Sequence, residues 1–428
     1  MAASSLVRAS VAHGKLVSGC YTCDILDTLV LRHFINKPPF GRAFATTSSN
    51  TSAATASFSA SQLQITRCPQ DQLKGKPDPK TLVFGRSFSD HMLRIDWDET
   101  TGWSAPQITP FQNFSMHPAA KVLHYALEAF EGTKAFRGYD DRIRLFRLDR
   151  NIDRLLNSTR RLALPEFDRV ELEKCIHKLV AIDSDWVPAS GEQMTALYIR
   201  PTIIGTEPTL GVDLSHQCIL YVILSPVGPY FKEGFKPVSL YANPKYVRAW
   251  PGGAGNAKLG SNYAPTIAHQ KVAESLNLQQ VLWLFGDDQK LTEVGCMNIM
   301  VCIRDSARQG RMTLVTPPLD DGLILPGIVR NSIIELVRDS WTDVDVVERY
   351  INISEIQSLV QNNNLVEMFG AGTACVVCPI KSIQLVNGDT IVVPTPEPEV
   401  SVAQRILKEI TDIQYGRRPH HWARILND

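Results

Sequence analysis

The chain has 428 residues, of which 44% are hydrophobic and 21% charged, an ordinary balance for a globular protein long enough for two domains. No apolar run approaches the roughly 20 residues that a membrane-spanning helix needs, so a membrane span is not expected. Formal net charge is zero and no stripe of Lys and Arg interleaves with aromatic residues, which argues against a nucleic-acid partner.

The first 62 residues differ from the rest of the chain. They hold five basic and two acidic residues and are rich in Ala, Ser and Thr, especially over 45–61. Basic, acid-poor, Ser-rich N-termini are typical of organellar transit peptides, and no apolar core follows the first arginine closely enough for a secretory signal. We therefore predict a mitochondrial transit peptide at 1–62, with residues 42–45 as a cleavage neighbourhood. A disordered N-terminal tail that carries no targeting signal is the alternative.

Beyond Leu82, short apolar strands alternate with helical patterns. Residues 142–146 are predicted to form a strand, and Asp149 is placed to cap a helix that ends before Pro165. Residues 170–183 carry a second amphipathic pattern with apolar side chains on one face.

Two neighbouring sheet strands are predicted next, at 196–200 and 218–224, on either side of a loop with Gly205, Pro208 and Gly211. A cluster of helix and strand breakers follows at 226–234, and the strand pattern restarts with 238–241. We place the domain boundary in that cluster. The predicted units are an N-terminal domain at 63–229, an interdomain linker at 230–237 and a C-terminal domain at 238–428.

Lys258 lies in a run of glycines and small residues, 252–263, and Tyr263 follows it by five positions. The run fits no nucleotide-binding loop, because Ala257 and Leu259 flank the lysine where a phosphate loop needs Gly and Ser or Thr. A lysine in a glycine-rich pocket suits Schiff-base chemistry, since desolvation lowers the pKa of its amine and frees a nucleophile. An ordinary surface charge is the alternative interpretation.

Several motifs in a fixed order give this segment a context. With them the chain, from about Leu82 to Trp422, resembles the branched-chain amino acid aminotransferases, which have the type IV fold of pyridoxal-phosphate enzymes. The motifs are Phe84-Gly85 with Ser89-Asp90-His91-Met92, Phe130-Glu131-Gly132, Leu197-Tyr198-Ile199-Arg200-Pro201, the lysine segment, Leu291-Thr292-Glu293-Val294-Gly295, Leu325-Pro326-Gly327 and Gly372-Thr373-Ala374-Cys375. No single one of them is specific.

The resemblance implies two domains, a small α/β domain and a larger barrel-like α/β domain, with pyridoxal 5'-phosphate between them. It makes Lys258 the catalytic lysine that binds the cofactor aldehyde, Glu293 the partner of the pyridine nitrogen and Tyr263 the donor to the ring oxygen. A carboxylate suits the nitrogen because an opposite charge raises the pKa of that nitrogen. Locally, Glu293 also fits a surface or helix-cap position, and Tyr263 fits core packing.

The phosphate requires an arginine or several backbone amides. The resemblance gives this role to Arg154, to the amides of Ile328 and Val329 after Leu325-Pro326-Gly327, and to Thr373. A Pro-Gly turn that enters the apolar run 328–337 would place a helix N-terminus against the anion. A plain turn and helix start is the alternative.

The substrate requires polar protein groups that bind its carboxylate and an apolar pocket for its side chain. By resemblance, Arg200 and Tyr198 lie on the carboxylate side together with the backbone at Thr373 and Ala374. The side-chain pocket is expected to use Phe84, Tyr125, Phe130 and Tyr230, some of them across the interface of a homodimer. Each aromatic residue alone is as easily a core residue.

Cysteines mark one departure and one regulatory candidate. After Glu-Val-Gly, where vertebrate-like members have threonine, this chain has Cys296, which lacks the hydroxyl but fills a similar volume. Cys375 and Cys378 form a Cys-x-x-Cys pair in a predicted Gly/Thr-rich loop, far from further zinc ligands. The resemblance to animal members implies a redox-sensitive regulatory pair, and two unreactive cysteines are the alternative.

The resemblance thus predicts the mitochondrial animal type of the family. The expected reaction is reversible ping-pong transfer of the amino group of Leu, Ile or Val to 2-oxoglutarate, with Lys258 as the base that takes the α-proton. Within the same fold, D-amino acid aminotransferase and aminodeoxychorismate lyase are the nearest alternatives. A thiol-switch protein acting through Cys375 and Cys378 is an alternative of another class.

Overall fold

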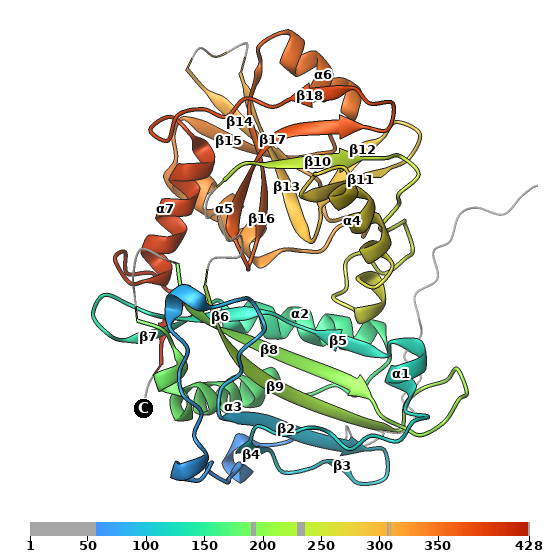
Figure 1. Ribbon diagram of the computed structural model, residues 1–428, viewed down its shortest axis with the longest axis vertical. Helices are drawn as coiled ribbons and strands as arrows, with labels where there is room; N and C mark the ends of the chain where they lie inside the picture. Colours follow the sequence, from blue (N-terminus) through green and yellow to red (C-terminus); the bar gives the residue numbers. More distant parts are fainter. Residues whose placement is uncertain (1–56, 190–193, 229–235, 306–307, 309, 427–428) are drawn as a thin grey trace, which may run out of the picture. The chain divides into compact units, whose positions relative to one another are not determined.

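A computed structural model describes residues 57–189, 194–228, 236–305, 308 and 310–426 (Figure 1). Its helices are α1 (Lys121–Tyr125), α2 (Leu148–Arg161), α3 (Arg169–Ile182), α4 (Thr266–Ser275), α5 (Ile328–Ser340), α6 (Ile353–Gln361) and α7 (Val402–Gln414). The predicted mixed α/β fold is confirmed, with two sheets that follow one another along most of the chain.

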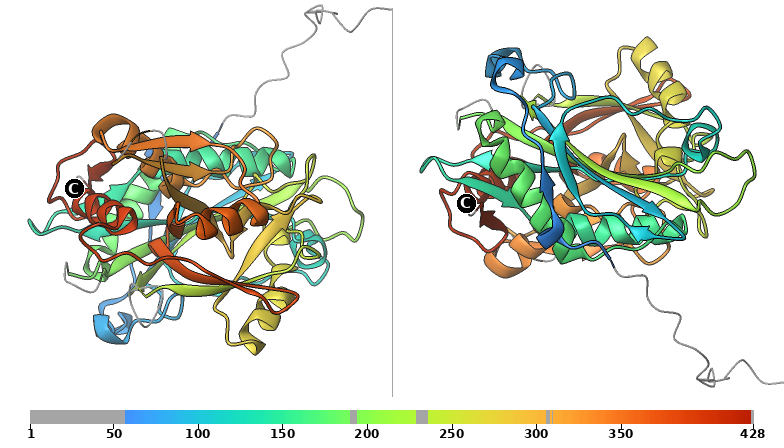
Figure 2. Two further views of the ribbon diagram at one scale, coloured as in Figure 1. Left: turned by 90° about the horizontal axis from the view of Figure 1, so that it is seen from above. Right: turned by 90° about the horizontal axis from the view of Figure 1, so that it is seen from below.

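The first sheet has ten strands and carries α2 and α3, which pack on each other and on the sheet (Figures 1 and 2). Its core is a cluster of buried aliphatic residues from β2, β8, β9 and the two helices. The strands are β1 (Gln64–Ile65), β2 (His91–Asp98), β3 (Gly102–Trp103), β4 (Gln107–Pro110), β5 (Glu128–Phe130), β6 (Thr133–Arg137), β7 (Ile143–Phe146), β8 (Ala196–Gly205), β9 (Gln217–Val227) and β19 (Ala423–Ile425).

The elements predicted in this half are present, with shifts at their ends. The strand predicted at 142–146 is β7, and the helix predicted at 170–183 is α3, capped by the Asp168 side chain. The proposed cap at Asp149 is wrong. The main-chain N–H of Arg147 bonds to the Trp422 carbonyl, so α2 begins at Leu148 and Asp149 lies in its first turn.

The predicted pair of neighbouring strands is confirmed as β8 and β9, which run antiparallel from Ala196 opposite Val227 to Gly205 opposite Cys218. Both strands are longer than predicted. Gly205 and Pro226, which we assigned to loop and breaker segments, lie within them. Long-range pairing over the whole register extends the strands past residues whose local preference is for turns.

The second sheet has nine strands and is partly closed. β12 pairs with β13 as well as with β11, so the path β12–β11–β10–β17–β16–β13 returns to its start as a barrel-like ring. β10 pairs in parallel with β11 and β17, and β14 pairs in parallel with β15, whereas the other pairings of this sheet are antiparallel. The strands are β10 (Val238–Ala242), β11 (Gln280–Phe285), β12 (Lys290–Val294), β13 (Met297–Arg304), β14 (Met312–Thr316), β15 (Val344–Glu348), β16 (Leu365–Gly372), β17 (Val376–Leu385) and β18 (Thr390–Val392).

The change from one sheet to the other falls between β9, which ends at Val227, and β10, which begins at Val238. The chain later returns, because β19 near the C-terminus joins β7 of the first sheet. The exact domain limits and the linker at 230–237, much of which lies outside the described residues, stay predictions. None of the described helices has the length and apolar character needed to span a membrane.

The predicted transit peptide lies mostly outside the described residues, which begin at Ser57. Its last residues are packed against the folded body. Phe58 is 3% exposed, and its ring contacts Trp103 edge-on at 5.4 Å and stacks with Phe167 at 6.4 Å. Folded structure therefore starts upstream of residue 62.

Candidate active site

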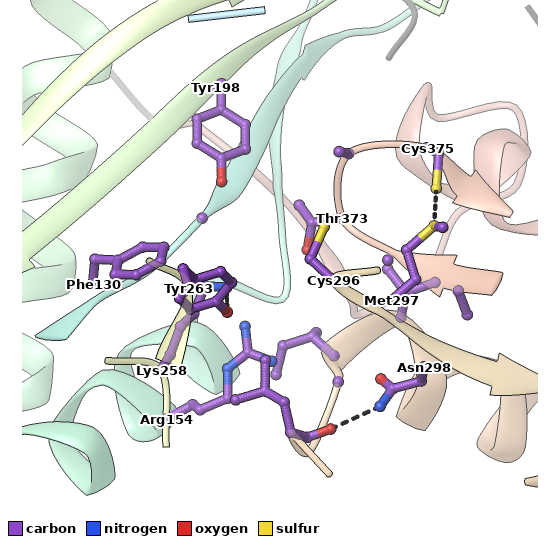
Figure 3. A pocket seen from close by; sticks show the side chains of 18 of the residues that line it. Phe130, Arg154, Tyr198, Lys258, Tyr263, Cys296, Met297, Asn298, Thr373 and Cys375 are labelled. Atoms are coloured by element: carbon purple, nitrogen blue, oxygen red, sulfur yellow. Dashed lines mark hydrogen bonds between the residues drawn. The ribbon is translucent and has the colours of Figure 1, made fainter. Parts of the chain in front are cut away.

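One cavity, with a volume of about 320 Å³, is lined by residues of both sheets. Figure 3 shows Lys258, Tyr263, Phe130 and Arg154 at one side and Cys296, Met297 and Thr373 at the other. The cavity brings together most of the residues predicted for the site. They are Phe84, Phe130, Arg154, Tyr198, Arg200, Lys258, Tyr263, Cys296, Leu325, Ile328, Val329, Thr373, Ala374 and Cys375.

Lys258 is held by its backbone and by one neighbour in the cavity. Its main-chain N–H donates to Ser158 Oγ at 2.8 Å, and its carbonyl accepts from the Phe130 N–H at 3.1 Å. Its amine donates to Tyr263 Oη at 2.9 Å, because the short helix Gly260–Asn262 turns the chain back on itself. The amine also lies 4.7 Å from the centre of the Phe130 ring.

The electrostatic environment of Lys258 differs from our expectation. Burial disfavours its ammonium, but Tyr263 and Glu131 stabilise the charge, and the pKa of Lys258 lies above its ordinary value. The predicted lowering of this pKa by desolvation is therefore wrong. In this environment Lys258 therefore carries a proton at neutral pH, and it can act as a nucleophile or as a base only after that proton has been removed.

Arg154 is fixed by a buried carboxylate that we did not predict as a site residue. Its Nε and Nη2 donate to the two oxygens of Glu131 at 2.6 and 2.9 Å, and its Nη1 donates to the Pro326 carbonyl at 2.9 Å. A guanidinium has five N–H groups, so about two remain for a ligand. Asn151 and Ser158 share this face of α2 and bind Glu131 and the Lys258 backbone.

The predicted helix start after Leu325-Pro326-Gly327 is confirmed as α5, with Gly327 as its N-cap residue. No side chain caps this end, and Ile328 and Val329 of its first turn line the cavity. A Cβ on Gly327 would clash with the Asn298 amide, so only glycine permits this close approach. The free amides and the helix dipole suit an anion.

Glu293 is buried, with 2% of its surface exposed, and it is not among the residues that line the cavity. Its Oε1 accepts the Leu325 N–H at 2.8 Å and faces Asn298 Nδ2 at 3.4 Å, and its Oε2 lies 3.0 Å from Arg248 Nε. Burial raises the pKa of Glu293 despite the nearby guanidinium. Its carboxylate is therefore fixed by Leu325 and Arg248 and faces Asn298, which does line the cavity.

Arg200 and Tyr198 project from β8 on the same face. The Arg200 guanidinium lies 4.8 Å from the centre of the Phe130 ring and 5.2 Å from that of Tyr198, and its Nη2 donates to Tyr198 Oη at 3.3 Å. Its Nε is buried and has no hydrogen-bond partner among the described residues. Because a buried donor without an acceptor is unfavourable, this group is suited to bind a ligand oxygen.

The sulfur groups differ in position. Cys296 is exposed and lines the cavity, and Cys375 Sγ lies 3.3 Å from Met297 Sδ (Figure 3). Cys378 belongs to strand β17 and is 2% exposed, so our placement of both thiols in one loop is wrong. Burial raises the pKa of Cys375 and raises that of Cys378 to about 12, which disfavours the reactive thiolates.

Among the described residues that were predicted to bind substrate, Tyr125 does not line the cavity. Tyr125, at the end of α1, is 40% exposed and its hydroxyl donates to the Leu210 carbonyl. Tyr230 lies outside the described residues. The residues that we missed are Glu131, Ser158, Arg248, Met297 and Asn298. Glu131 and Asn298 stand inside or beside quoted motifs, whereas Ser158 and Arg248 carry no distinguishing local pattern.

Comparisons with known proteins agree with this geometry. The model of the family "Amino-transferase class IV" matches residues 128–383. The cytosolic branched-chain-amino-acid aminotransferase of sheep (Ovis aries) is 51% identical over 367 residues, which cover 86% of this chain and 93% of the relative. The mitochondrial one of cattle (Bos taurus) is 49% identical over 371 residues, covering 86% and 92%.

Solved structures show the same fold at low sequence identity. The branched-chain aminotransferase of Thermoproteus uzoniensis, with norvaline, has a TM-score of 0.61 and 23% identity, covering 78% of this chain and 99% of that one. The enzyme of Thermobaculum terrenum in its PLP form has a TM-score of 0.61 and 17% identity, covering 80% and 100%. The chain therefore belongs to the class IV aminotransferases, in the family of the branched-chain-amino-acid aminotransferases.

Proposed function

We propose that this protein transfers the amino group of L-leucine, L-isoleucine or L-valine to 2-oxoglutarate, reversibly and by a ping-pong mechanism. The main support for this proposal is the hydrogen bond from Lys258 Nζ to Tyr263 Oη, at 2.9 Å, in a cavity that Arg154 and the N-terminus of α5 also line. A nucleophilic amine beside an anion-binding helix end suits a carbonyl compound that bears a phosphate. The names of the relatives support the choice of substrates.

Pyridoxal 5'-phosphate is the cofactor that we propose, and the residues present fit it. Lys258 would hold its aldehyde carbon, Tyr263 its ring oxygen and Glu293 its ring nitrogen. When bound, the cofactor supplies a carbonyl that captures an amine and a ring that accepts the electrons of a broken Cα–H bond. The Glu293 carboxylate forms an ion pair with Arg248, so it would already be fixed in position when it contacts the ring nitrogen.

The phosphate end of the cavity is positively polarised by several groups together. Arg154 offers its remaining N–H groups, and Ile328 and Val329 offer the free amides of α5. Thr373 adds a hydroxyl from the opposite side. Because Glu131 already balances the charge of Arg154, we expect the helix amides to contribute as much as the guanidinium to anion binding.

Lys258 is the proposed catalytic base. Its Nζ would accept the proton of the substrate α-carbon once the amine is free, and its raised pKa lets it hold that proton. Tyr263 keeps the amine in one place through their hydrogen bond. Ser158 fixes the Lys258 backbone, so the amine does not have to be ordered during the reaction.

The α-carboxylate is proposed to bind at the side of Arg200, Tyr198 and the Thr373–Ala374 backbone. The buried, unpartnered Nε of Arg200 supports this assignment. The branched side chain would lie against Phe84 and Phe130, which line the cavity. Cys296 would replace the threonine hydroxyl of related chains with a thiol of similar volume, so we expect the reaction to persist with an altered rate.

A homodimer is the proposed assembly. Leu123, Tyr125, Leu210, Val212 and Leu214 are between 40% and 84% exposed and belong to α1 and the loop between β8 and β9. Such a cluster of exposed apolar side chains marks a protein–protein contact. Sedimentation of the wild type and of Val212→Asp tests this, and a wild type that is monomeric and fully active would contradict it.

Localisation in the mitochondrion, after removal of an N-terminal transit peptide, is a further proposal. It rests on the composition of the first residues, since mitochondrial and cytosolic relatives match at similar identity. Fusion of residues 1–56 to a fluorescent protein tests it directly. Fluorescence spread through the cytosol would contradict the assignment.

A substrate panel separates this function from its alternatives. With enzyme carrying pyridoxal phosphate and 2-oxoglutarate as acceptor, we expect L-leucine, L-isoleucine and L-valine to yield glutamate and D-alanine to yield none. Conversion of D-alanine alone would favour a D-amino acid aminotransferase. Aminodeoxychorismate cleavage without transamination would favour the lyase.

A further inference from the structure

Lys134 is a buried lysine that the proposed function does not use. It lies on β6, directly opposite Tyr198 on β8, and 6% of its surface is exposed. Within the part of the chain that the structure describes, no carboxylate acts on its ammonium, since only the Cys375 thiol opposes the effect of burial on its pKa. Instead its Nζ donates to the Ala374 carbonyl at 2.7 Å, across from the first sheet to the loop between β16 and β17.

This hydrogen bond fixes the orientation of a peptide unit at the cavity. A trans peptide is planar, so its carbonyl and its N–H point in opposite directions. When Lys134 holds the Ala374 carbonyl, the Cys375 N–H of the same peptide faces away from the lysine. Thr373, Ala374 and Cys375 all line the cavity, at the side where we propose the substrate carboxylate to bind.

The charge of Lys134 has a second consequence. An ammonium that is buried without a counterion is unfavourable, and an anion nearby relieves this penalty. A carboxylate on the turn at Thr373–Ala374 would lie one peptide unit from the amine. The lysine would then attract the anion through the turn without touching it.

We infer that Lys134 is a positioning residue for carboxylate recognition: it orients the Ala374–Cys375 peptide and supplies the positive charge behind it. The inference rests on the proposed function for the identity of the carboxylate, a branched-chain 2-amino or 2-oxo acid. It assigns the lysine no contact with the reacting atoms.

Burial lowers the pKa of Lys134 to about 8, with the Cys375 thiol acting in the opposite direction. The amine is therefore charged at neutral pH and loses its proton at moderately alkaline pH. The Cys375 thiol acts on the Lys134 amine, and Tyr198 lies opposite Lys134 on β8. The further titratable or charged side chains that line the cavity are Arg154, Arg200, Lys258, Tyr263 and Cys296. A comparison that leaves these groups unchanged is needed to isolate Lys134.

The test compares wild type, Lys134→Met and Lys134→Arg, all loaded with pyridoxal phosphate, by calorimetric binding of 4-methylpentanoate and of its amide, 4-methylpentanamide. The two ligands share a branched chain and differ in charge. Because Lys134→Met removes the charge, we expect its affinity for 4-methylpentanoate to be about tenfold lower than that of the wild type. Its affinity for 4-methylpentanamide should fall by less than about twofold. Lys134→Arg, which keeps charge and donor, is expected to restore carboxylate binding to within about threefold.

The pH dependence gives a readout that a structural role would not move. Between about pH 7 and 9 the wild type should lose affinity for 4-methylpentanoate as Lys134 deprotonates, and Lys134→Arg should lose less because arginine stays charged. Equal weakening of carboxylate and amide binding in Lys134→Met, or no restoration by Lys134→Arg, would overturn the inference.

Failure of this inference and failure of the proposed function give different results. A wild type that binds 4-methylpentanoate better than the amide but does not transaminate L-leucine would refute the proposed function, and the Lys134 comparison would still decide its own question. A wild type that transaminates L-leucine while Lys134→Met keeps its carboxylate preference would refute only the role of Lys134.

Discussion

The guanidinium of Arg154 and the carboxylate of Glu131 form a two-bond ion pair, at 2.6 and 2.9 Å, in the buried wall between α2 and the cavity. Glu131 is 0% exposed and also accepts the Asn151 amide at 2.8 Å. The arginine proposed to bind the phosphate is thus held in place before any ligand arrives. This relationship connects the Phe130-Glu131-Gly132 motif to the anion site.

Glu131→Gln is expected to destabilise the fold by ~3–5 kcal/mol, because it leaves a buried guanidinium without its counterion. Affinity for pyridoxal phosphate should fall as well, since Arg154 loses its fixed orientation. Denaturant unfolding and cofactor titration measure the two effects. Glu166→Gln, which breaks an exposed pair with Arg160, is the control and should change stability by less than about 1 kcal/mol. Equal effects of the two changes would contradict the account.

The same pair predicts a pH dependence of stability. Burial opposes ionisation of Glu131, but Arg154 outweighs it, and the pKa of Glu131 lies below the ordinary value of 4.5. A carboxyl with a depressed pKa contributes stability above its unfolded pKa and loses that contribution as pH falls through its folded pKa. The difference in melting temperature between wild type and Glu131→Gln should therefore shrink as pH falls below 4.5. A difference that stays constant down to the lowest pH at which both fold would exclude this ion pair as its source.

Ser158→Ala should loosen Lys258, the proposed catalytic base. The Ser158 hydroxyl accepts the Lys258 N–H at 2.8 Å and donates to the Arg154 carbonyl at 3.0 Å. Its removal leaves a partly buried amide without an acceptor, which costs up to ~1–3 kcal/mol. We expect lower stability and a lower kcat with L-leucine. Thr159→Val is the matched control, because Thr159 donates only to the Leu155 carbonyl within α2, and a kcat loss as large in the control would refute the link.

Among Cys296, Cys375 and Cys378, Cys296 is expected to react first with iodoacetamide. It is exposed in the cavity, whereas burial raises the pKa of Cys375 and Cys378. Alkylation should slow turnover, bound pyridoxal phosphate should slow the alkylation, and Cys296→Thr should remain active and resistant. If Cys375→Ser prevents inactivation by iodoacetamide and Cys296→Thr does not, the reactive thiol belongs to the Cys375/Cys378 pair. That result would favour the redox-regulatory hypothesis for this pair.

A chain that starts at residue 63 should be less stable than one that starts at 57. The longer chain keeps Phe58 between Trp103 and Phe167 and keeps the Ala60 N–H bond to Glu171 at 2.7 Å. Loss of a buried phenylalanine costs ~3–5 kcal/mol. Phe58→Ala in the longer chain should reproduce most of the loss in urea unfolding. Identical stability of the two chains would show that these residues are not part of the folded body.

The sequence predicted the site best where the chemistry demands one residue type. Lys258, Tyr263, Arg154 and the helix start at Gly327 stand in motifs whose spacing the resemblance could assign, and the structure places all of them at one cavity. The strands β7, β8 and β9 followed from apolar runs alone. Only their ends were misjudged, and β8 and β9 are longer than predicted because pairing with distant strands extends a strand past local breakers.

Other features depend on contacts that one chain position cannot reveal. Asp149 is a good cap by type, yet Arg147 bonds to the Trp422 carbonyl, 275 residues away, and the helix begins earlier. The raised pKa of Lys258 arises from Glu131 and Tyr263 together, whereas desolvation alone suggested the opposite sign. Cys375 and Cys378 differ in burial because β17 begins between them.

The most direct test of the central claim is a single turnover of wild type and Lys258→Ala with L-leucine, both loaded with pyridoxal phosphate and followed by the visible absorbance of the cofactor. We predict rapid conversion by the wild type and a rate lower by at least about a hundredfold for Lys258→Ala, since a positioned general base contributes roughly 10²–10⁴-fold. Lys258→Ala that converts L-leucine at the wild-type rate would contradict the account.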